Sequence, residues 1–169
     1  MKNISVPTEL ATPTDLTSKE VSAVVAAVNP LIADAFAAYV KYKNFHWHLS
    51  GPHFRDYHLL FDEHADMIFV SIDIMAERVR RIGGTTIRSI THVSSLQSIE
   101  DDNDEYVSPA DMVRRLLDDN RTMAEAMRKA IQVCDDNRDK PTGNLLQDIL
   151  DKTEKRIWFL FEILQNPEQ

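Results

Sequence analysis

The sequence predicts an all-α protein built as a bundle of four helices. Apolar residues recur with a period near 3.6, and we find no runs of β-branched residues with a period of two next to hairpin residues. Only four glycines occur among 169 residues, and they fall where the helical periodicity stops or starts: Gly51, Gly83, Gly84 and Gly143. Because glycine punctuates helices, these positions mark the ends of long helical segments.

The composition fits one domain. Hydrophobic residues make up 43% of the chain and charged residues 27%, which is enough for a single core. The formal charge of −8 and the pI near 5.2 argue against a general binder of nucleic acids or anionic membranes, and they favour a cationic partner. The one cysteine, Cys134, excludes an intramolecular disulfide.

We expect no membrane segment, because no apolar run approaches the length of a membrane span. The first ten residues, MKNISVPTEL, lack the apolar core of a signal peptide. A cytoplasmic protein, nucleoid-associated if it binds DNA, is therefore the expectation.

Residues 1–16 contain Pro7 and Pro13 and are expected to form a flexible N-terminal tail. Thr17 and Glu20 then have the spacing of a capping box at a helix start. This first helix is expected to end near Val28, where Asn29 and Pro30 interrupt it, because proline lacks the amide hydrogen of a helix interior. A new helix is predicted over 31–49, ended by the glycine and proline at 51 and 52.

The next helix is predicted over 55–82, ahead of the glycine pair at 83 and 84. Its apolar residues cover more than one face, which predicts packing both on its own bundle and on another subunit. Those residues include Leu60, Phe61, Met67, Ile68, Phe69, Ile72, Met75 and Val79.

Residues 85–107 form the connection to the third bundle helix. The stretch SSLQSI within it is expected to form a short helix, and the acidic run over 100–105 a solvated loop rather than a cation site. A third helix, opened by Ser108 and Pro109, continues to about 135, and a fourth runs from after Pro141 to about 165. The connection is long enough to span the bundle, which permits two parallel neighbours as in ferritin-like bundles. The bundle domain is thus expected over 17–165, with a short C-terminal tail at 166–169.

A metal site is predicted from four residues on the second helix, with His46 nearby on the first. At about 100° per residue, Asp62, Asp73 and Glu77 lie roughly 40°, 60° and 100° from His58, on one stripe of the helix. However, fifteen residues separate His58 from Asp73, so they stand roughly 22 Å apart along the axis. One chain therefore does not close the site.

A second copy of the helix would complete it. If two copies lie antiparallel across a two-fold axis near Met67 and Ile68, the histidine end of one chain meets the carboxylate end of the other. Pairs of acidic and histidine residues four apart are common on helices and are more often solvated or ion-paired than metal-bound. Here two such pairs share a stripe flanked by apolar positions, where unpaired carboxylates would be costly to bury. The coincidence favours the metal site.

Imidazole and carboxylate ligands suit Fe(II), Mn(II) or Zn(II), and iron is our first expectation, with zinc and manganese as competitors. Di-iron bundles with a site inside one chain carry Glu-x-x-His on two helices. This sequence has no such motif, which again favours an interface. Trp47 has two open interpretations, packing at the subunit contact or electron donation to iron. The other histidines are assigned to the surface or to hydrogen bonds: His48, His53, His64 and His92.

The stretch KNFHWHLSGPHFRDYHLLFDEHADMIFVSIDIMAERVRRIGG closely resembles the signature region of the Dps mini-ferritins, and the resemblance extends over about residues 20–165. It implies His46, His58 and Asp62 as ligands from one subunit, with Asp73 and Glu77 from its two-fold mate. It also implies a hollow dodecamer that oxidises Fe(II), preferentially with hydrogen peroxide rather than dioxygen, and stores the ferric mineral, which protects DNA.

The resemblance further implies an acidic iron-entry pore near the start of the last helix. Asp139 and Asp148 are candidates for its lining, but Asn144 stands where many relatives have aspartate.

Family members that bind DNA directly use lysine-rich tails, which release counterions from the phosphates. Here residues 1–16 contain only Lys2, and the chain ends NPEQ, so we expect weak or absent DNA binding. The alternatives are a nucleoid-compacting DNA binder with a vestigial metal site, and a purely structural bundle with a solvated acidic stripe.

Overall fold

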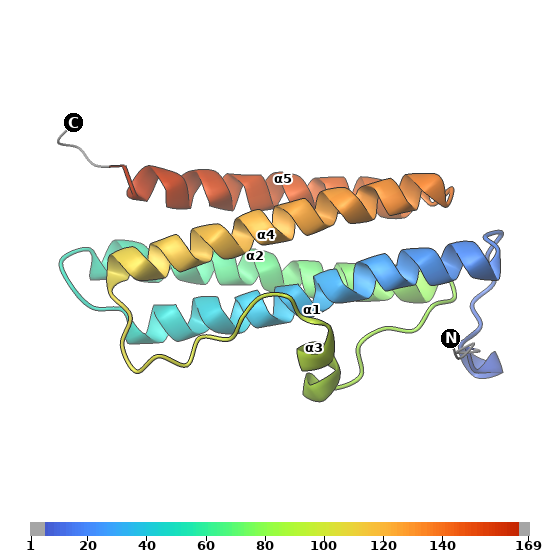
Figure 1. The fold of residues 1–169 in the computed structure, drawn as a ribbon, viewed down its shortest axis with the longest axis horizontal. Helices are drawn as coiled ribbons and strands as arrows, with labels where there is room; N and C mark the ends of the chain where they lie inside the picture. The colour runs from blue at the N-terminus through green and yellow to red at the C-terminus, as the bar shows by residue number, and fades with distance from the viewer. Residues whose placement is uncertain (1–5, 166–169) are drawn as a thin grey trace.

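A computed structural model of the protein describes residues 6–165, and this part of the chain is helical with no strand (Figure 1). The all-α prediction is confirmed. The elements are the 3-10 turn η1 (Thr8–Leu10) and the α-helices α1 (Ser18–His48), α2 (Phe54–Arg81), α3 (Ile90–Leu96), α4 (Pro109–Asp136) and α5 (Lys140–Ile163). The expected C-terminal tail at 166–169 lies outside the described residues.

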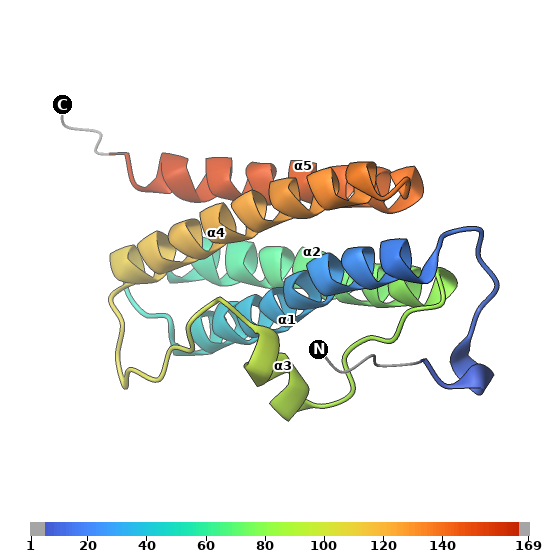
Figure 2. The same ribbon diagram turned by 45° about the vertical axis from the view of Figure 1, so that its right-hand side comes forward.

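The bundle consists of two antiparallel hairpins, α1 with α2 and α4 with α5 (Figure 1). The connection from α2 to α4 runs the length of the bundle, with α3 beside α1 on its outside (Figure 2). As predicted, α2 and α4 run in the same direction. They are not neighbours, however: α1 contacts both of them and α5 also contacts both, so α2 and α4 occupy diagonal corners of the bundle.

Pro30 does not interrupt the first helix, contrary to the prediction, because α1 is continuous from Ser18 to His48. A proline inside a helix removes one hydrogen bond and costs roughly 3 kcal/mol. The residues around it, Val28, Leu31 and Ile32, are buried in the core, and their packing offsets that cost.

The statement that no apolar run approaches the length of a membrane span needs correction, whereas the expectation of no membrane segment stays a prediction. Within the described residues α1, and no other helix, is long and apolar enough to cross a membrane by length and composition alone. A core helix of a bundle passes the same test. Here α1 packs against α2, α3 and α4, and a large part of its surface is buried inside the bundle.

The helix starts follow the predicted caps. Thr17 and Glu20 form the capping box of α1, and Ser108 accepts a hydrogen bond from the Asp111 amide at the start of α4. The bounds of α2 agree with the prediction to within one residue. The short helix in the crossover begins earlier than SSLQSI predicts, at Ile90, because Ser89 caps it.

Asp34 fixes the crossover against α1. Its carboxylate is 2% exposed and accepts hydrogen bonds from the amides of Ser98 (2.5 Å) and Ile99 (3.0 Å) and from the Ser98 hydroxyl (2.9 Å). A buried carboxylate needs such donors, since burying it without partners is costly. The same contacts hold the start of the acidic run close to the bundle.

The flexibility of the N-terminal tail stays a prediction, and the structure describes one conformation of this segment. From residue 6 onward it forms the η1 turn and lies against the C-terminal end of α2, where Arg80 Nη2 donates to the Leu10 carbonyl at 2.8 Å. Arg138, after α4, binds Glu20 through Nε at 2.6 Å. These links place residues 10–17 beside the residues that follow Glu77.

Candidate metal centre

His46 and His58 bind each other's backbone at the turn between α1 and α2. Nδ1 of His46 lies 2.8 Å from the His58 carbonyl oxygen, and Nδ1 of His58 lies 3.0 Å from the His46 carbonyl oxygen. Their rings stack with centroids 3.7 Å apart. A carbonyl oxygen only accepts, so each Nδ1 carries the hydrogen, and in the neutral imidazole Nε2 keeps the lone pair that binds a metal.

Asp62 joins the two histidines from one turn further along α2. Its Oδ1 lies 4.0 Å from His46 Nε2 and 2.5 Å from Lys43 Nζ. The hydrogen bond from Lys43 lowers the pKa of the Asp62 carboxyl below its usual value, so the group is a carboxylate at neutral pH. Thus three of the five predicted ligands lie near one another at the same end of the bundle, and a lysine ammonium occupies part of the space next to the carboxylate.

Asp73 and Glu77 lie apart from that group on the exposed side of α2. Together they line a shallow cavity of about 450 Å³ with Thr12, Arg80 and Thr86, among others. Glu77 Oε2 accepts a hydrogen bond from Arg81 at 2.7 Å, and both side chains are largely exposed. We call the first group the histidine half-site (His46, His58, Asp62) and this group the acidic half-site (Asp73, Glu77).

The two half-sites of one chain do not meet. They lie on one continuous helix, and eleven residues at about 1.5 Å each put roughly 16 Å between Asp62 and Asp73. Within residues 6–165 of the single chain, no three side chains of His, Cys, Asp or Glu lie close enough together to hold an ion.

An apolar surface lies between the half-sites. Phe69, Val70 and Ile74 project from α2 with 55%, 54% and 37% of their surface exposed, beside Ile90 of α3 at 78%. Together with their neighbours they line a groove of about 880 Å³. Trp47, next to His46, is 64% exposed. Exposed apolar patches of this kind mark contact surfaces.

A buried polar layer crosses the bundle centre, with one residue from each long helix: Tyr42, His64, Asn120 and Arg156. The Arg156 Nε donates to Asn120 Oδ1 at 2.8 Å, and Asn120 Nδ2 donates to the Tyr42 hydroxyl at 2.7 Å. The Tyr42 hydroxyl lies 3.4 Å from His64 Nδ1. Burial, and then the Arg156 charge, lower the pKa of His64 to about 3, so this histidine is neutral.

In di-iron bundles, a metal site inside one chain lies at the position of this layer. Here the buried Arg156 guanidinium disfavours a metal ion at that position, because like charges repel strongly in a core. The sequence interpretation missed this layer. A sign of this layer in the sequence is that each long helix carries one polar residue at a position where the helical period predicts an apolar one. His64 is thus a hydrogen-bonding residue of the core rather than of the surface. The remaining histidines, His48, His53 and His92, are exposed or partly exposed.

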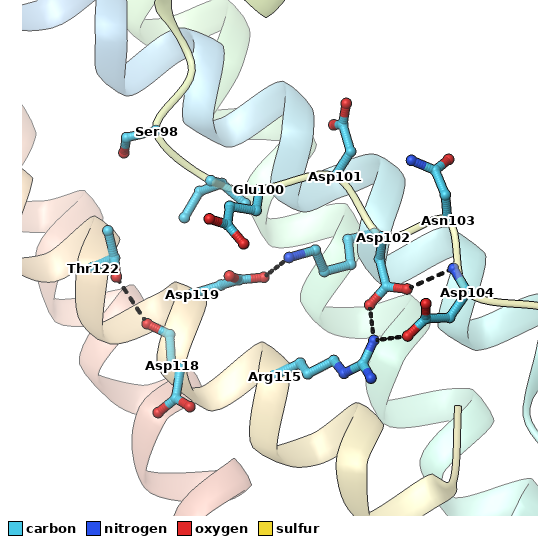
Figure 3. A pocket seen from close by; sticks show the side chains of 12 residues that line it. Ser98, Glu100, Asp101, Asp102, Asn103, Asp104, Arg115, Asp118, Asp119 and Thr122 are labelled. Carbon is cyan, nitrogen blue, oxygen red and sulfur yellow. Dashed lines mark hydrogen bonds and ion pairs between the residues drawn. The ribbon is translucent and has the colours of Figure 1, made fainter. Parts of the chain in front are cut away.

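A second cavity, of about 500 Å³, lies between the crossover and α4 (Figure 3). Arg115 holds Asp102 at 2.7 Å and Asp104 at 2.8 Å, and Lys41 lies 2.7 Å from Asp119. Most of the acidic run is exposed, as expected for a solvated loop, but the Asp102 side chain is 5% exposed and ion-paired. The carboxylates of Asp102, Asp104 and Asp119 are therefore paired with cationic side chains of the protein itself.

The three candidate pore residues have different environments. Asp139 is 1% exposed; its carboxylate caps α5 through the Thr142 amide and pairs with Arg78 Nη2 at 2.7 Å. Its oxygens are therefore already used within the single chain, which argues against Asp139 as a pore lining. Asn144 and Asp148 are exposed on α5, and for them the pore stays a prediction.

Among known protein families, the family model described as the ferritin-like domain matches residues 25–169 of this chain. The DNA protection during starvation protein of Brevibacillus brevis is 32% identical over 142 residues, which cover 84% of this chain and 95% of that protein. The chain belongs to the Dps family of ferritin-like proteins. Its fold is similar to other Dps structures: DpsC from Streptomyces coelicolor (28% identity, TM-score 0.90, covering 94% of this chain and 92% of that chain) and a Dps protein from Bacillus brevis (30%, 0.85, 89% and 100%).

Not every similar protein has a Dps name. An uncharacterized low temperature-induced protein from Nostoc is 29% identical over 151 residues, covering 89% of this Dps chain and 84% of that protein. The DNA protection during starvation protein 1 of Deinococcus radiodurans is 27% identical over the same length.

Proposed function

We propose that this Dps protein oxidises Fe(II) at sites shared by two subunits and stores the ferric product inside a hollow dodecamer, thereby protecting the cell and its DNA. Family membership supports a role in iron sequestration and stress protection. The observation that carries the proposal is the division of the candidate ligands: His46, His58 and Asp62 lie near the start of α2, while Asp73 and Glu77 lie roughly 22 and 28 Å from His58 along the same helix.

A two-fold axis is the simplest way to join the half-sites. An isologous interface places the same surface on both subunits, so one antiparallel α2 contact creates two equivalent sites. The exposed residues between the half-sites, such as Phe69 and Val70, supply an apolar centre for that contact. Burial there excludes water and strengthens the attraction between the carboxylates and a divalent cation.

The chemistry follows from the ligands. Two imidazoles and three carboxylates bind Fe(II), and the carboxylates bind Fe(III) more strongly than Fe(II), because hard anionic oxygens favour the higher charge. Hydrogen peroxide takes up two electrons and two protons when it is reduced to two water molecules. We propose it as the preferred oxidant because two ferrous ions supply both electrons at once, and no hydroxyl radical is released. Dioxygen is the slower alternative.

Subunit complementation tests the shared site. Neither His58→Ala nor Asp73→Ala protein should oxidise Fe(II) with peroxide above the rate without protein. When the two variants are dissociated, mixed and reassembled, half of the dimers are mixed, and each mixed dimer has one intact site. We therefore expect activity to return to about a quarter of the wild-type value.

Two results would contradict the proposal. No gain on mixing, in shells of wild-type mass, would show that the ligands do not come from two chains. Wild-type protein that oxidises Fe(II) no faster than buffer would favour the purely structural bundle.

A second candidate function is compaction of DNA. The charge of −8 and the scarcity of lysine in the tail oppose it. A gel shift at 20 and 200 mM salt tests this: strong retardation that weakens steeply with salt would restore the DNA-binding function.

A further inference from the structure

Three arginines follow Glu77 within four residues on α2: Arg78, Arg80 and Arg81. Residues three or four apart on a helix are neighbours, so Arg80 and Arg81 both have the spacing to reach the Glu77 carboxylate. Only Arg81 does so, in an exposed pair of the kind that contributes little and is easily broken. A guanidinium group bound tightly to the Glu77 carboxylate would compete with a metal ion for the same oxygens.

The other two arginines are tied to different partners. Arg78 donates to Asp139 at 2.7 Å and to the Thr142 hydroxyl at 2.8 Å. Arg80 donates through Nη2 to the Leu10 carbonyl at 2.8 Å and through Nη1 to the Gly84 carbonyl. The Arg80 guanidinium is thus held by the N-terminal segment, although it lines the same cavity as Asp73 and Glu77.

The segment that holds Arg80 is a strap, residues 10–17, pressed against the end of α2. Gly83 has φ +82, and a Cβ added there would lie 2.9 Å from the Thr12 carbonyl oxygen. A side chain at position 83 would therefore strain the backbone and displace the strap. Beneath the strap is a cavity of about 460 Å³, so polar links such as the Arg80 to Leu10 hydrogen bond and the packing of Leu16 hold the strap in place.

We propose that the N-terminal strap keeps Arg80 away from the acidic half-site and so raises the affinity of that half-site for a divalent cation. Arg80 is then the competing charge, bound to the Leu10 and Gly84 carbonyls instead of Glu77. Displacing the strap removes the Leu10 contact, so the guanidinium turns to the Glu77 carboxylate and competes with the metal. This inference rests on the proposed function, because it assigns metal binding to Asp73 and Glu77.

The test compares Gly83→Ala, Arg80→Gln and the double variant in assembled protein. Binding of Co(II), which does not turn over, is measured by titration calorimetry, and hydrogen exchange of residues 10–16 reports the strap. Gly83→Ala should exchange faster at the strap and bind Co(II) about tenfold more weakly. Adding Arg80→Gln should restore the affinity while the strap stays displaced, because the competing charge is gone.

Gly143→Ala is the matched control, since a Cβ there meets its nearest neighbour at 3.6 Å, an ordinary contact. Its Co(II) affinity should equal that of the wild type. Equal affinities for wild type and Gly83→Ala would overturn the proposal. So would a weakened Gly83→Ala that Arg80→Gln does not rescue, or a fall in assembled mass in Gly83→Ala, which would assign the strap to structure. Wild type that binds no Co(II) would instead refute the shared metal site.

Discussion

Lys43 Nζ lies 2.5 Å from Asp62 Oδ1, so the carboxylate of the histidine half-site is paired with an ammonium group of its own chain. The pair is partly exposed, which limits its strength. In the proposed function, a divalent cation that binds Asp62 displaces or shares this contact. We therefore expect the lysine to lower the affinity of the histidine half-site for metal.

Replacing Lys43 should strengthen metal binding. Lys43→Gln removes both the competing contact and a positive charge close to the site, so we expect Co(II) to bind about fivefold more tightly in a calorimetric titration. Asp62→Asn should have the opposite effect, because it removes a ligand charge. Lys152→Gln, at an exposed position of α5, is the control. An unchanged affinity in Lys43→Gln would show that the ammonium does not compete.

Asn120 should be essential to the buried polar layer. It is fully buried and joins Arg156 to Tyr42, so Asn120→Leu leaves a guanidinium in the core with fewer acceptors. We expect the unfolding free energy to fall by about 3 kcal/mol, measured as a lower denaturation midpoint at fixed protein concentration.

Arg156→Leu added to Asn120→Leu should recover part of this loss, since the unpaired charge disappears with the arginine. Gln132→Ala, at an exposed position of α4, should change stability by less than about 0.5 kcal/mol. A double variant less stable than Asn120→Leu alone would contradict the role assigned to the charge.

Glu20 should make the stability of the bundle depend on pH in the acidic range. Hydrogen bonds from Arg138 and then from Thr17 lower the pKa of Glu20 from 4.5 to about 2. Because the folded protein has the lower pKa, the contribution is complete above pH 4.5 and is lost as the pH falls toward 2. The melting temperature of the wild type should exceed that of Glu20→Gln at pH 7, and the difference should shrink between pH 4.5 and 2. A constant difference over this range would mean that the carboxylate charge is not involved.

The helices and their ends could be predicted because their causes are local. The capping box of Thr17 and Glu20, the Ser108 cap and the glycine pair after α2 act within a few residues. Pro30 shows the limit of local information. The low helix propensity of proline predicts a break at this position, whereas the burial of Val28, Leu31 and Ile32 keeps the helix continuous. This burial depends on residues that are distant in the sequence.

The candidate site divides in the same way. Helical spacing alone separates the histidine and acidic half-sites along α2. It gives no information on the Lys43 pair, on the Leu10 carbonyl that binds Arg80, or on the ion pair of Asp139 with Arg78. Each of these contacts joins different segments of the chain, so no local pattern predicts them.

The sequence by itself determined that the protein is helical, where its long helices begin and end apart from the break it wrongly predicts at Pro30, and that His58 and Asp73 stand too far apart on one helix to share an ion. Only the tertiary structure decided which charged groups are free and which are bound: Asp139 to Arg78, Arg80 to the N-terminal strap, and Arg156 to the bundle core. The physical reason is that helix period and capping act over a few residues, whereas the partner of a long charged side chain depends on which distant segments pack beside it.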